Sequence, residues 1–157
     1  MIELTGGSAA DPAAIAAVER QLAVNFPESY RTFVETRDGA RPEPNRVRAE
    51  NGTELGVDQF IPVAEIIKER NRIETIPLAA FPVAWMEGGN YVFIDGRRGG
   101  RVRFWDHESP DDMIDVAPDF ESFLNAIEPF DPDTVELKPG QVEKAWIDPD
   151  FLKQFGG

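Results

Sequence analysis

The sequence of 157 residues contains no cysteine and a single histidine, His107. Without cysteine the chain cannot form disulfides or thiolate metal sites, which fits a reducing compartment such as the cytoplasm, where we expect the protein to act. With one histidine, a multi-histidine metal centre is excluded, and only His107 is available for a nucleophile–histidine pair. We therefore expect no metal and no cofactor.

Long apolar runs are also missing. No stretch approaches the roughly 20 apolar residues of a membrane-spanning helix. The first seven residues lack the basic segment and apolar run of a signal peptide, so we expect neither a signal peptide nor a membrane partner. The hydrophobic fraction is 41%, which is close to that of ordinary globular proteins. The length fits one domain, which we place at residues 1–157.

Cations are absent from the segment between Arg103 and Lys138. The net charge is −13, and it is unevenly spread: residues 1–103 carry −2, whereas residues 104–157 carry −11. Such a charge repels nucleic acid and anionic membranes, so neither is an expected partner. The acidic segment has two interpretations, a solvated face or a docking surface for a cationic protein. Nothing in the sequence predicts the oligomeric state.

Two helices are predicted near the N-terminus. The first spans residues 12–23, because Asp11 can cap it and Pro12 suits the first helical position. The second starts near Pro27 and stops at Gly39, which is suited to a left-handed helix end. Each helix has an apolar stripe at helical spacing, formed in the first by Ile15, Val18 and Leu22 and in the second by Phe26, Tyr30, Phe33 and Val34.

The segment 39–56 is polar and contains Pro42 and Pro44, so it is predicted to be a long variable connection, with room for a short strand near Val47. A strand at residues 57–61 follows it. Pro62 then opens a third helix, which buries Val63, Ile66 and Ile67.

The middle of the chain is rich in strands. Residues 81–86, 91–94 and 101–105 are predicted strands joined by tight turns, which gives an antiparallel meander. The continuous apolar run 91–94 is typical of a central strand covered on both faces. A further strand at 113–116 and a helix at 118–127 follow, and the tail 130–157 is predicted to dock on the domain through a short helix after Trp146. Helices on both sides of a meander indicate an α+β fold.

No catalytic motif is present. The sequence has no Walker, nucleophile-elbow or dinucleotide-binding pattern. Asp106, His107 and Glu108 are consecutive, and side chains of consecutive residues point apart, which disfavours a shared metal. We predict that the protein is not an enzyme, although the many carboxylates leave a glycosidase-type pair open. The three tryptophans, Trp85, Trp105 and Trp146, are core residues or, for one of them, the lining of a groove.

The order of several motifs resembles the SUKH superfamily, the family of Smi/Knr cell-wall-regulator-like domains. The first block is a Glu-x-x-Leu helix, an apolar residue with proline, and Tyr and Phe three residues apart. The second is an apolar strand, a Gly-Asn turn, a strand ending in Asp and a strand ending in Trp; the third is a Phe-x-x-Phe-Leu helix. These blocks correspond to Glu19, Leu22, Phe26, Pro27, Tyr30, Phe33 and Gly39, then Gly89, Asn90, Asp95, Gly100 and Trp105, then Phe120, Phe123 and Leu124.

The resemblance covers nearly the whole chain and implies a SUKH-like α+β domain of the bacterial immunity-protein type. Such proteins bind and neutralise polymorphic or contact-delivered toxins, many of which are nucleases. The cognate toxin is expected to be basic, because a nuclease grips phosphates, and an acidic inhibitor can block such a cleft. The alternative is a non-catalytic regulatory scaffold. The predicted partner-binding residues lie in the loop after the strand that ends at Trp105, and are Asp106, Glu108, Asp111 and Asp112.

Overall fold

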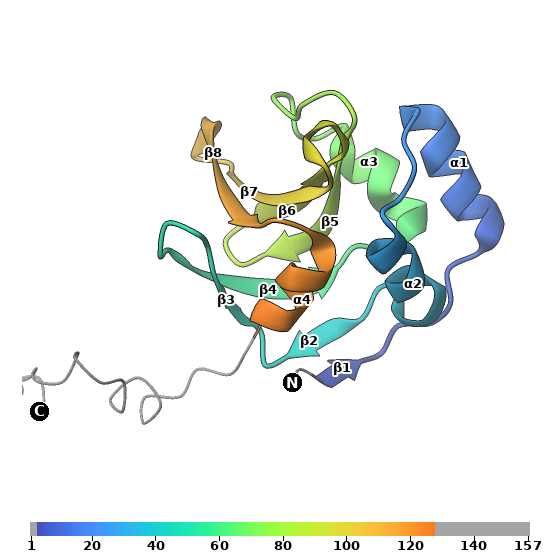
Figure 1. Ribbon diagram of the computed structural model, residues 1–157, viewed down its shortest axis with the longest axis horizontal. Helices are drawn as coiled ribbons and strands as arrows, with labels where there is room; N and C mark the ends of the chain where they lie inside the picture. The colour runs from blue at the N-terminus through green and yellow to red at the C-terminus, as the bar shows by residue number, and fades with distance from the viewer. Residues whose placement is uncertain (1–2, 128–157) are drawn as a thin grey trace, which may run out of the picture.

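The computed structural model describes residues 3–127, and it confirms the α+β class. Six strands form an antiparallel sheet in the order β3-β4-β5-β6-β7-β8, and β1 and β2 form a separate pair (Figure 1). The elements are β1 (Glu3–Thr5), α1 (Pro12–Leu22), α2 (Glu28–Arg37), β2 (Arg41–Glu43), β3 (Arg46–Arg48), β4 (Glu54–Phe60), α3 (Ile66–Arg70), β5 (Ala80–Met86), β6 (Asn90–Asp95), β7 (Arg101–Asp106), β8 (Ser109–Ala117) and α4 (Phe120–Ala126).

The two N-terminal helices form where the sequence predicts them. The side chain of Asp11 accepts a hydrogen bond of 2.9 Å from the backbone N–H of Ala13 and caps α1. The helix ends at Ala23, which adopts the left-handed conformation with φ of 56°. Gly39, after the end of α2, has φ of 82°, as predicted for a left-handed stop. Local capping thus sets the length of α1, whereas α2 ends at Asp38, whose backbone is extended, one residue before Gly39.

The predicted meander is confirmed. Strands β4 to β8 each pair with the next along the chain, and all pairs are antiparallel. Residues Tyr91–Asp95 of β6 are all buried, so the central strand is covered on both faces. The last predicted helix, at 118–127, corresponds to α4, which Asp119 caps through the N–H of Ser122 at 2.8 Å.

The segment 39–56 differs from the prediction of one long connection. It contains β2, β3 and the beginning of β4, and β3 is the short strand predicted near Val47. Val47 is buried, and it lies opposite Leu55 in the β3–β4 pair. Pro42 is tolerated in β2 because this short strand pairs only with β1 and lies outside the main sheet. Residues 3–5, for which no element was predicted, provide that partner strand.

Aromatic rings from helices and sheet form the centre of the core. The ring of Tyr30 in α2 lies 4.9 Å from Phe26 and 5.0 Å from Phe120 in α4, measured between ring centroids. Phe33 lies 4.6 Å from Phe60 of β4. These contacts fasten α2 and α4 to the same region of the sheet, and edge-on ring packing of this kind adds to the hydrophobic stabilisation.

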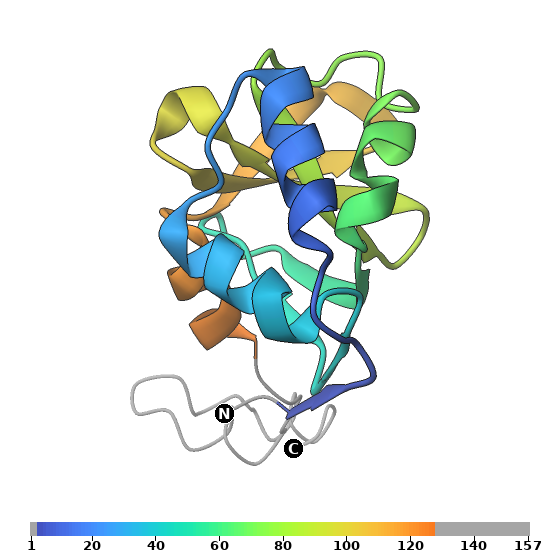
Figure 2. The same cartoon turned by 90° about the vertical axis from the view of Figure 1, so that its right-hand side faces the viewer.

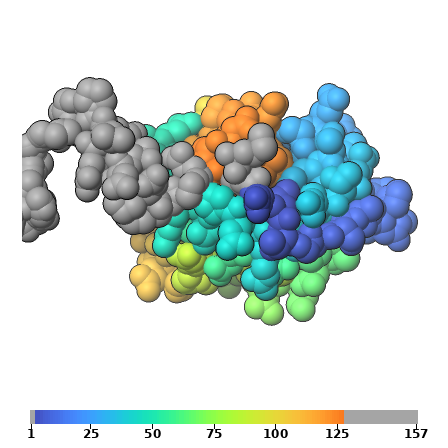
Figure 3. Space-filling view, turned by 90° about the horizontal axis from the view of Figure 1, so that it is seen from below, coloured from blue at the N-terminus to red at the C-terminus, as the bar shows by residue number. Residues whose placement is uncertain are grey.

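Seen from the side, α1, α2 and α3 stand in front of the strands (Figure 2). Below them, the surface of β1 adjoins that of the segment around β2 (Figure 3). The main sheet curls, because the tip of the β3–β4 hairpin reaches β8: the N–H of Glu50 donates a bond of 3.0 Å to the carbonyl of Asp115. The hairpin of β7 and β8 projects from the side of the molecule away from α1 (Figure 1).

No helix among residues 3–127 is long and apolar enough to cross a membrane. The predicted docking of the tail 130–157, including Trp146, falls outside the described residues.

Candidate functional site

The four predicted partner-binding residues lie on one hairpin. Strands β7 and β8 are joined at the pair Asp106–Ser109, so His107 and Glu108 form the turn between them. The side chain of Asp106 accepts a bond of 2.9 Å from the N–H of Glu108, a local contact that favours this turn. We call β7, β8 and this turn the acidic hairpin.

The structure places Asp111 and Asp112 in β8 rather than in the predicted loop. Strand β8 begins at Ser109, earlier than the predicted start at Met113. The composition Ser-Pro-Asp-Asp is typical of a turn, but the backbone of these residues is extended. A bulge interrupts the pairing of β8 with β7 here, and a residue outside the sheet holds this part of β8 in place. The hydroxyl of Thr75 donates a bond of 2.8 Å to the carbonyl of Pro110.

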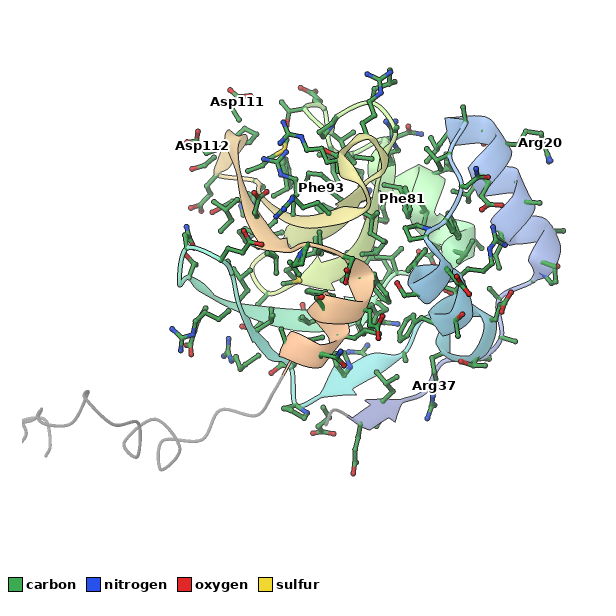
Figure 4. All side chains as sticks on the ribbon, viewed as in Figure 1. Arg20, Arg37, Phe81, Phe93, Asp111 and Asp112 are labelled. Atoms are coloured by element: carbon green, nitrogen blue, oxygen red, sulfur yellow. The ribbon has the colours of Figure 1, made fainter. Side chains whose placement is uncertain are left out.

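The carboxylates at the end of this hairpin are not neutralised by arginine or lysine within residues 3–127. Asp106 and Glu108 each lie 3.9 Å from a ring nitrogen of His107, and their side chains are 37% and 80% exposed. Asp111 and Asp112 are exposed and form no ion pair in this part of the chain. Both extend from the outer tip of the hairpin, on the opposite side of the molecule from Arg20 and Arg37 (Figure 4).

Carboxylates nearer the base of the hairpin are paired. Arg103 binds Asp115 at 2.9 Å and lies 3.9 Å from Asp95. Arg101 binds Glu50 at 3.1 Å and Asp115 at 3.6 Å. The hairpin therefore separates into a neutralised base and an acidic end, and the acidic end produces an outward negative field.

His107 has a structural role in the turn. Its ring Nδ1 lies 2.7 Å from Oδ1 of Asn90, and its backbone N–H donates to the same oxygen at 3.0 Å. Asn90 thus ties the turn of the acidic hairpin to the turn between β5 and β6. Among residues 3–127, no group of three potential ligands could hold a metal ion.

A groove that sequence reasoning did not locate lies beside this hairpin. It has a volume of about 480 Å³ and is open to solvent. Trp85 is one of its walls, which matches the interpretation that one tryptophan lines a groove, whereas Trp105 is buried. We call it the Trp85 groove; it is lined by Arg41, Asp58, Gln59, Trp85, Met86, Gly89, Asn90 and Tyr91.

A buried carboxylate holds two side chains of the groove. Oε1 of Glu69 accepts a bond of 2.7 Å from the hydroxyl of Tyr91 and one of 3.1 Å from the indole N–H of Trp85. Burial acts to raise the pKa of Glu69, but the bonds from Tyr91 and Trp85 and the charges of Arg72 and Lys68 outweigh it, so the pKa lies below its ordinary value. Glu69 is therefore an ionised acceptor at neutral pH. No sequence pattern identified it, because its partners are 16 and 22 residues away.

The sequence model of the SMI1 / KNR4 family (SUKH-1) matches residues 9–126, well over half of the chain. The chain belongs to this family. The match confirms the resemblance to the SUKH superfamily, and it spans the acidic hairpin and every residue of the Trp85 groove. No curated protein matches the chain.

SUKH-1 domains are in general non-catalytic immunity or regulatory modules, and membership is consistent with an immunity type of role. The described part of the SUKH-1 domain offers two features suited to binding a partner. One is the acidic end of the hairpin, and the other is a groove with a fixed aromatic wall. They adjoin through the contact of Asn90 with His107.

Proposed function

We propose that this SUKH-1 protein is an immunity protein, which binds a polymorphic or contact-delivered bacterial toxin in the cytoplasm and neutralises it by occlusion. The observation that carries the proposal is the acidic end of the hairpin. Four exposed or half-exposed carboxylates lie there without an arginine or lysine partner among residues 3–127, whereas those at the hairpin base are paired. The four are Asp106, Glu108, Asp111 and Asp112.

The expected partner is a basic protein such as a nuclease. A nuclease binds phosphates through lysine and arginine, and a set of carboxylates can form ion pairs with the same side chains. Opposite charge also raises the association rate, which falls steeply as salt screens the interaction. Neither nucleic acid nor an anionic membrane suits a chain with a net charge of −13.

The distribution of charge supports a defined orientation of the partner. Exposed arginines of the helical side, such as Arg20 and Arg37, lie across the molecule from Asp111 and Asp112 (Figure 4). A cationic partner is attracted more strongly to the hairpin end than to the helical side, where exposed arginines stand among exposed glutamates such as Glu28 and Glu35. Steering of this kind favours one docking face over random collisions.

The test is a capture experiment from the native cells with three full-length baits at low and moderate salt. The first bait is the wild type. The second carries Asp106→Asn, Glu108→Gln, Asp111→Asn and Asp112→Asn. The third removes the same number of charges from exposed sites elsewhere, through Glu3→Gln, Glu28→Gln, Glu35→Gln and Glu121→Gln.

The proposal expects a stoichiometric basic protein on the wild type and on the third bait, and its loss from the second bait and from all baits as salt rises. The captured protein must be toxic when expressed alone and harmless when co-expressed with the wild type. A partner held equally by the second bait would refute the acidic surface. A stable partner without toxicity would support the regulatory scaffold instead.

A further inference from the structure

The floor of the Trp85 groove is built from three neighbouring strands. Gln59 of β4 lies opposite Trp85 of β5, which lies opposite Tyr91 of β6. A second hollow of about 430 Å³ adjoins the groove along β2 and β4, and Arg41 and Asp58 line both. Together they form a trough rather than an isolated pit, and a trough suits an extended chain better than a compact ligand.

The aromatic wall of the groove is fixed in place. The polar groups of Trp85 and Tyr91 both bind Oε1 of Glu69, so these groups are satisfied within the domain. Gln59 donates a bond of 3.0 Å to the carbonyl of Gly39, which occupies one of its two amide N–H groups. What the aromatic side chains offer to a ligand is therefore carbon surface. Side chains already held in one rotamer lose little entropy on binding, which favours affinity.

The rim of the groove is open at the turn between β5 and β6. Gly88 and Gly89 there have φ of 84° and 83°, a conformation that side chains rarely adopt. Because these residues have no side chains, the path from Trp85 to the acidic hairpin is not obstructed. A Cβ at Gly89 would lie 3.9 Å from the ring of His107, which shows how near the hairpin turn is.

Carboxylates flank the apolar part of the trough on both sides. Asp58 is exposed on one side, next to Arg41. On the other, the contact of Asn90 with His107 brings in the turn that carries Asp106 and Glu108. With one arginine against three carboxylates, the surroundings of the apolar wall are acidic.

We propose that the Trp85 groove binds an extended segment of the partner protein in which an apolar side chain stands between lysine or arginine residues. The apolar side chain packs on the indole of Trp85, and the flanking cations meet Asp58 on one side and the acidic hairpin on the other. This inference rests on the proposed function, which makes the partner a cationic protein, and adds a second contact that supplies specificity beyond charge.

The test uses the full-length protein labelled with ¹⁵N and three blocked pentapeptides. The probe is Lys-Arg-Leu-Arg-Lys, with Lys-Arg-Gly-Arg-Lys and Glu-Glu-Leu-Glu-Glu as controls. The readout is the amide and indole N–H signals in two-dimensional NMR spectra. We expect the probe to shift the indole signal of Trp85 and the amides of Gly89 and Asn90. The glycine peptide should bind about tenfold more weakly, since one buried leucine is worth roughly that factor, and the acidic peptide should not bind.

Two variants locate the binding without disturbing the core. Asp58→Lys reverses an exposed charge in the trough and should weaken the binding of the probe peptide about tenfold. Glu35→Lys makes the same change on the exposed face of α2 and should leave its affinity within about twofold of the wild type.

Other outcomes overturn the inference in distinguishable ways. Shifts confined to the acidic hairpin, with equal affinity for the leucine and glycine peptides, would refute the groove and leave the proposed function standing. No shift with any cationic peptide would refute the groove, and the capture experiment would then decide the proposed function separately. Signals of the groove that move with protein concentration alone would assign it to a second copy of the chain. If the indole signal of Trp85 shifts in the variant Trp146→Ala without any peptide, the groove is assigned to the chain's own C-terminal part.

Discussion

The hydroxyl of Tyr91 donates a hydrogen bond of 2.7 Å to the buried carboxylate of Glu69, which links the central strand to α3. The same oxygen receives the indole N–H of Trp85. Replacing Glu69 with alanine leaves both donors without an acceptor, and we expect a loss of about 2–4 kcal/mol in the free energy of unfolding. Urea denaturation followed by tryptophan fluorescence measures it.

Glu69→Gln is the matched control for that prediction. Its amide oxygen can still accept both bonds, so the loss should be only about 1 kcal/mol. The hydrogen bonds and nearby cations lower the pKa of Glu69 despite its burial, and this direction sets the sign of the pH dependence of stability. Its stabilisation is present above the ordinary carboxyl range and is lost as the pH falls through the folded-state pKa. Equal stability of the alanine and glutamine variants would contradict this account.

A second prediction concerns Arg103 at the base of the acidic hairpin. Its side chain is 16% exposed and pairs with Asp115, while Asp95 beside it is only 3% exposed. Arg103→Ala leaves these carboxylates without their buried cation and should cost about 2–4 kcal/mol of unfolding free energy. Arg48→Ala is the comparison, because Arg48 is 62% exposed and pairs with a half-exposed Glu54. It should cost less than about 0.5 kcal/mol, and similar losses for the two variants would refute the distinction.

The elements predicted well are those whose signals are local. The cap at Asp11, the left-handed stop at Gly39 and the buried run of β6 each depend on a few consecutive residues, and the structure has all three. The strands β1 and β2 were missed because each is three residues long and is stabilised by the other, 38 positions away at the pair Leu4–Pro42. No local pattern reports a partner at that distance.

The candidate site divides in the same way. The acidic end of the hairpin is visible in the sequence as a missing run of cations, and the structure gathers the four predicted residues on one hairpin. For the Trp85 groove, the sequence left only two alternatives for the tryptophans, a place in the core or, for one of them, the lining of a groove. Its geometry depends on sheet register and on a carboxylate from α3, neither of which is encoded by spacing along the chain.

Tyr30 gives a third prediction. Its hydroxyl is buried and has no hydrogen-bond partner among the described residues, while its ring contacts Phe26, Phe81 and Phe120. Tyr30→Phe keeps the ring and removes the unsatisfied group, so the free energy of unfolding should stay the same or rise by about 1 kcal/mol. Tyr30→Ala, which removes the ring as well, should lose about 3–5 kcal/mol. A large loss for the phenylalanine variant would mean that the hydroxyl has a partner.

The negative charges at the acidic end of the hairpin should contribute nothing favourable to stability, since an asparagine at position 106 can still accept the N–H of Glu108. The carboxylates of this end repel one another and have no arginine or lysine partner among residues 3–127, so neutralising all four should change the unfolding free energy by at most about 0.5 kcal/mol, towards greater stability at low salt. Thermal denaturation at two salt concentrations checks this. A clear loss of stability would assign these residues to folding and weaken the case for a docking surface. The variant carries Asp106→Asn, Glu108→Gln, Asp111→Asn and Asp112→Asn.

Asp38 should make stability depend on pH in the opposite sense to an ordinary ion-paired carboxylate. Both of its carboxylate oxygens accept the N–H of Val63, at 3.0 and 3.1 Å. Burial nevertheless raises the pKa of Asp38 from 3.8 to about 6, since this outweighs the lowering by the bond from Val63. The folded state then binds the proton more tightly than the unfolded state, so this group lowers stability as the pH rises from about 4 to about 6.

Asp38→Asn removes that titration while keeping one oxygen for the N–H of Val63. The variant should match the wild type near pH 4 and exceed it by about 1–2 kcal/mol at pH 7, a figure reduced for the partial exposure of the group. Glu35→Gln, on the exposed face of the preceding helix α2, should follow the wild-type curve throughout. Denaturation curves at half-unit pH steps give the difference directly. If the curve of Asp38→Asn runs parallel to that of the wild type from pH 4 to 7, the carboxylate of Asp38 is as well solvated in the folded protein as in the unfolded chain.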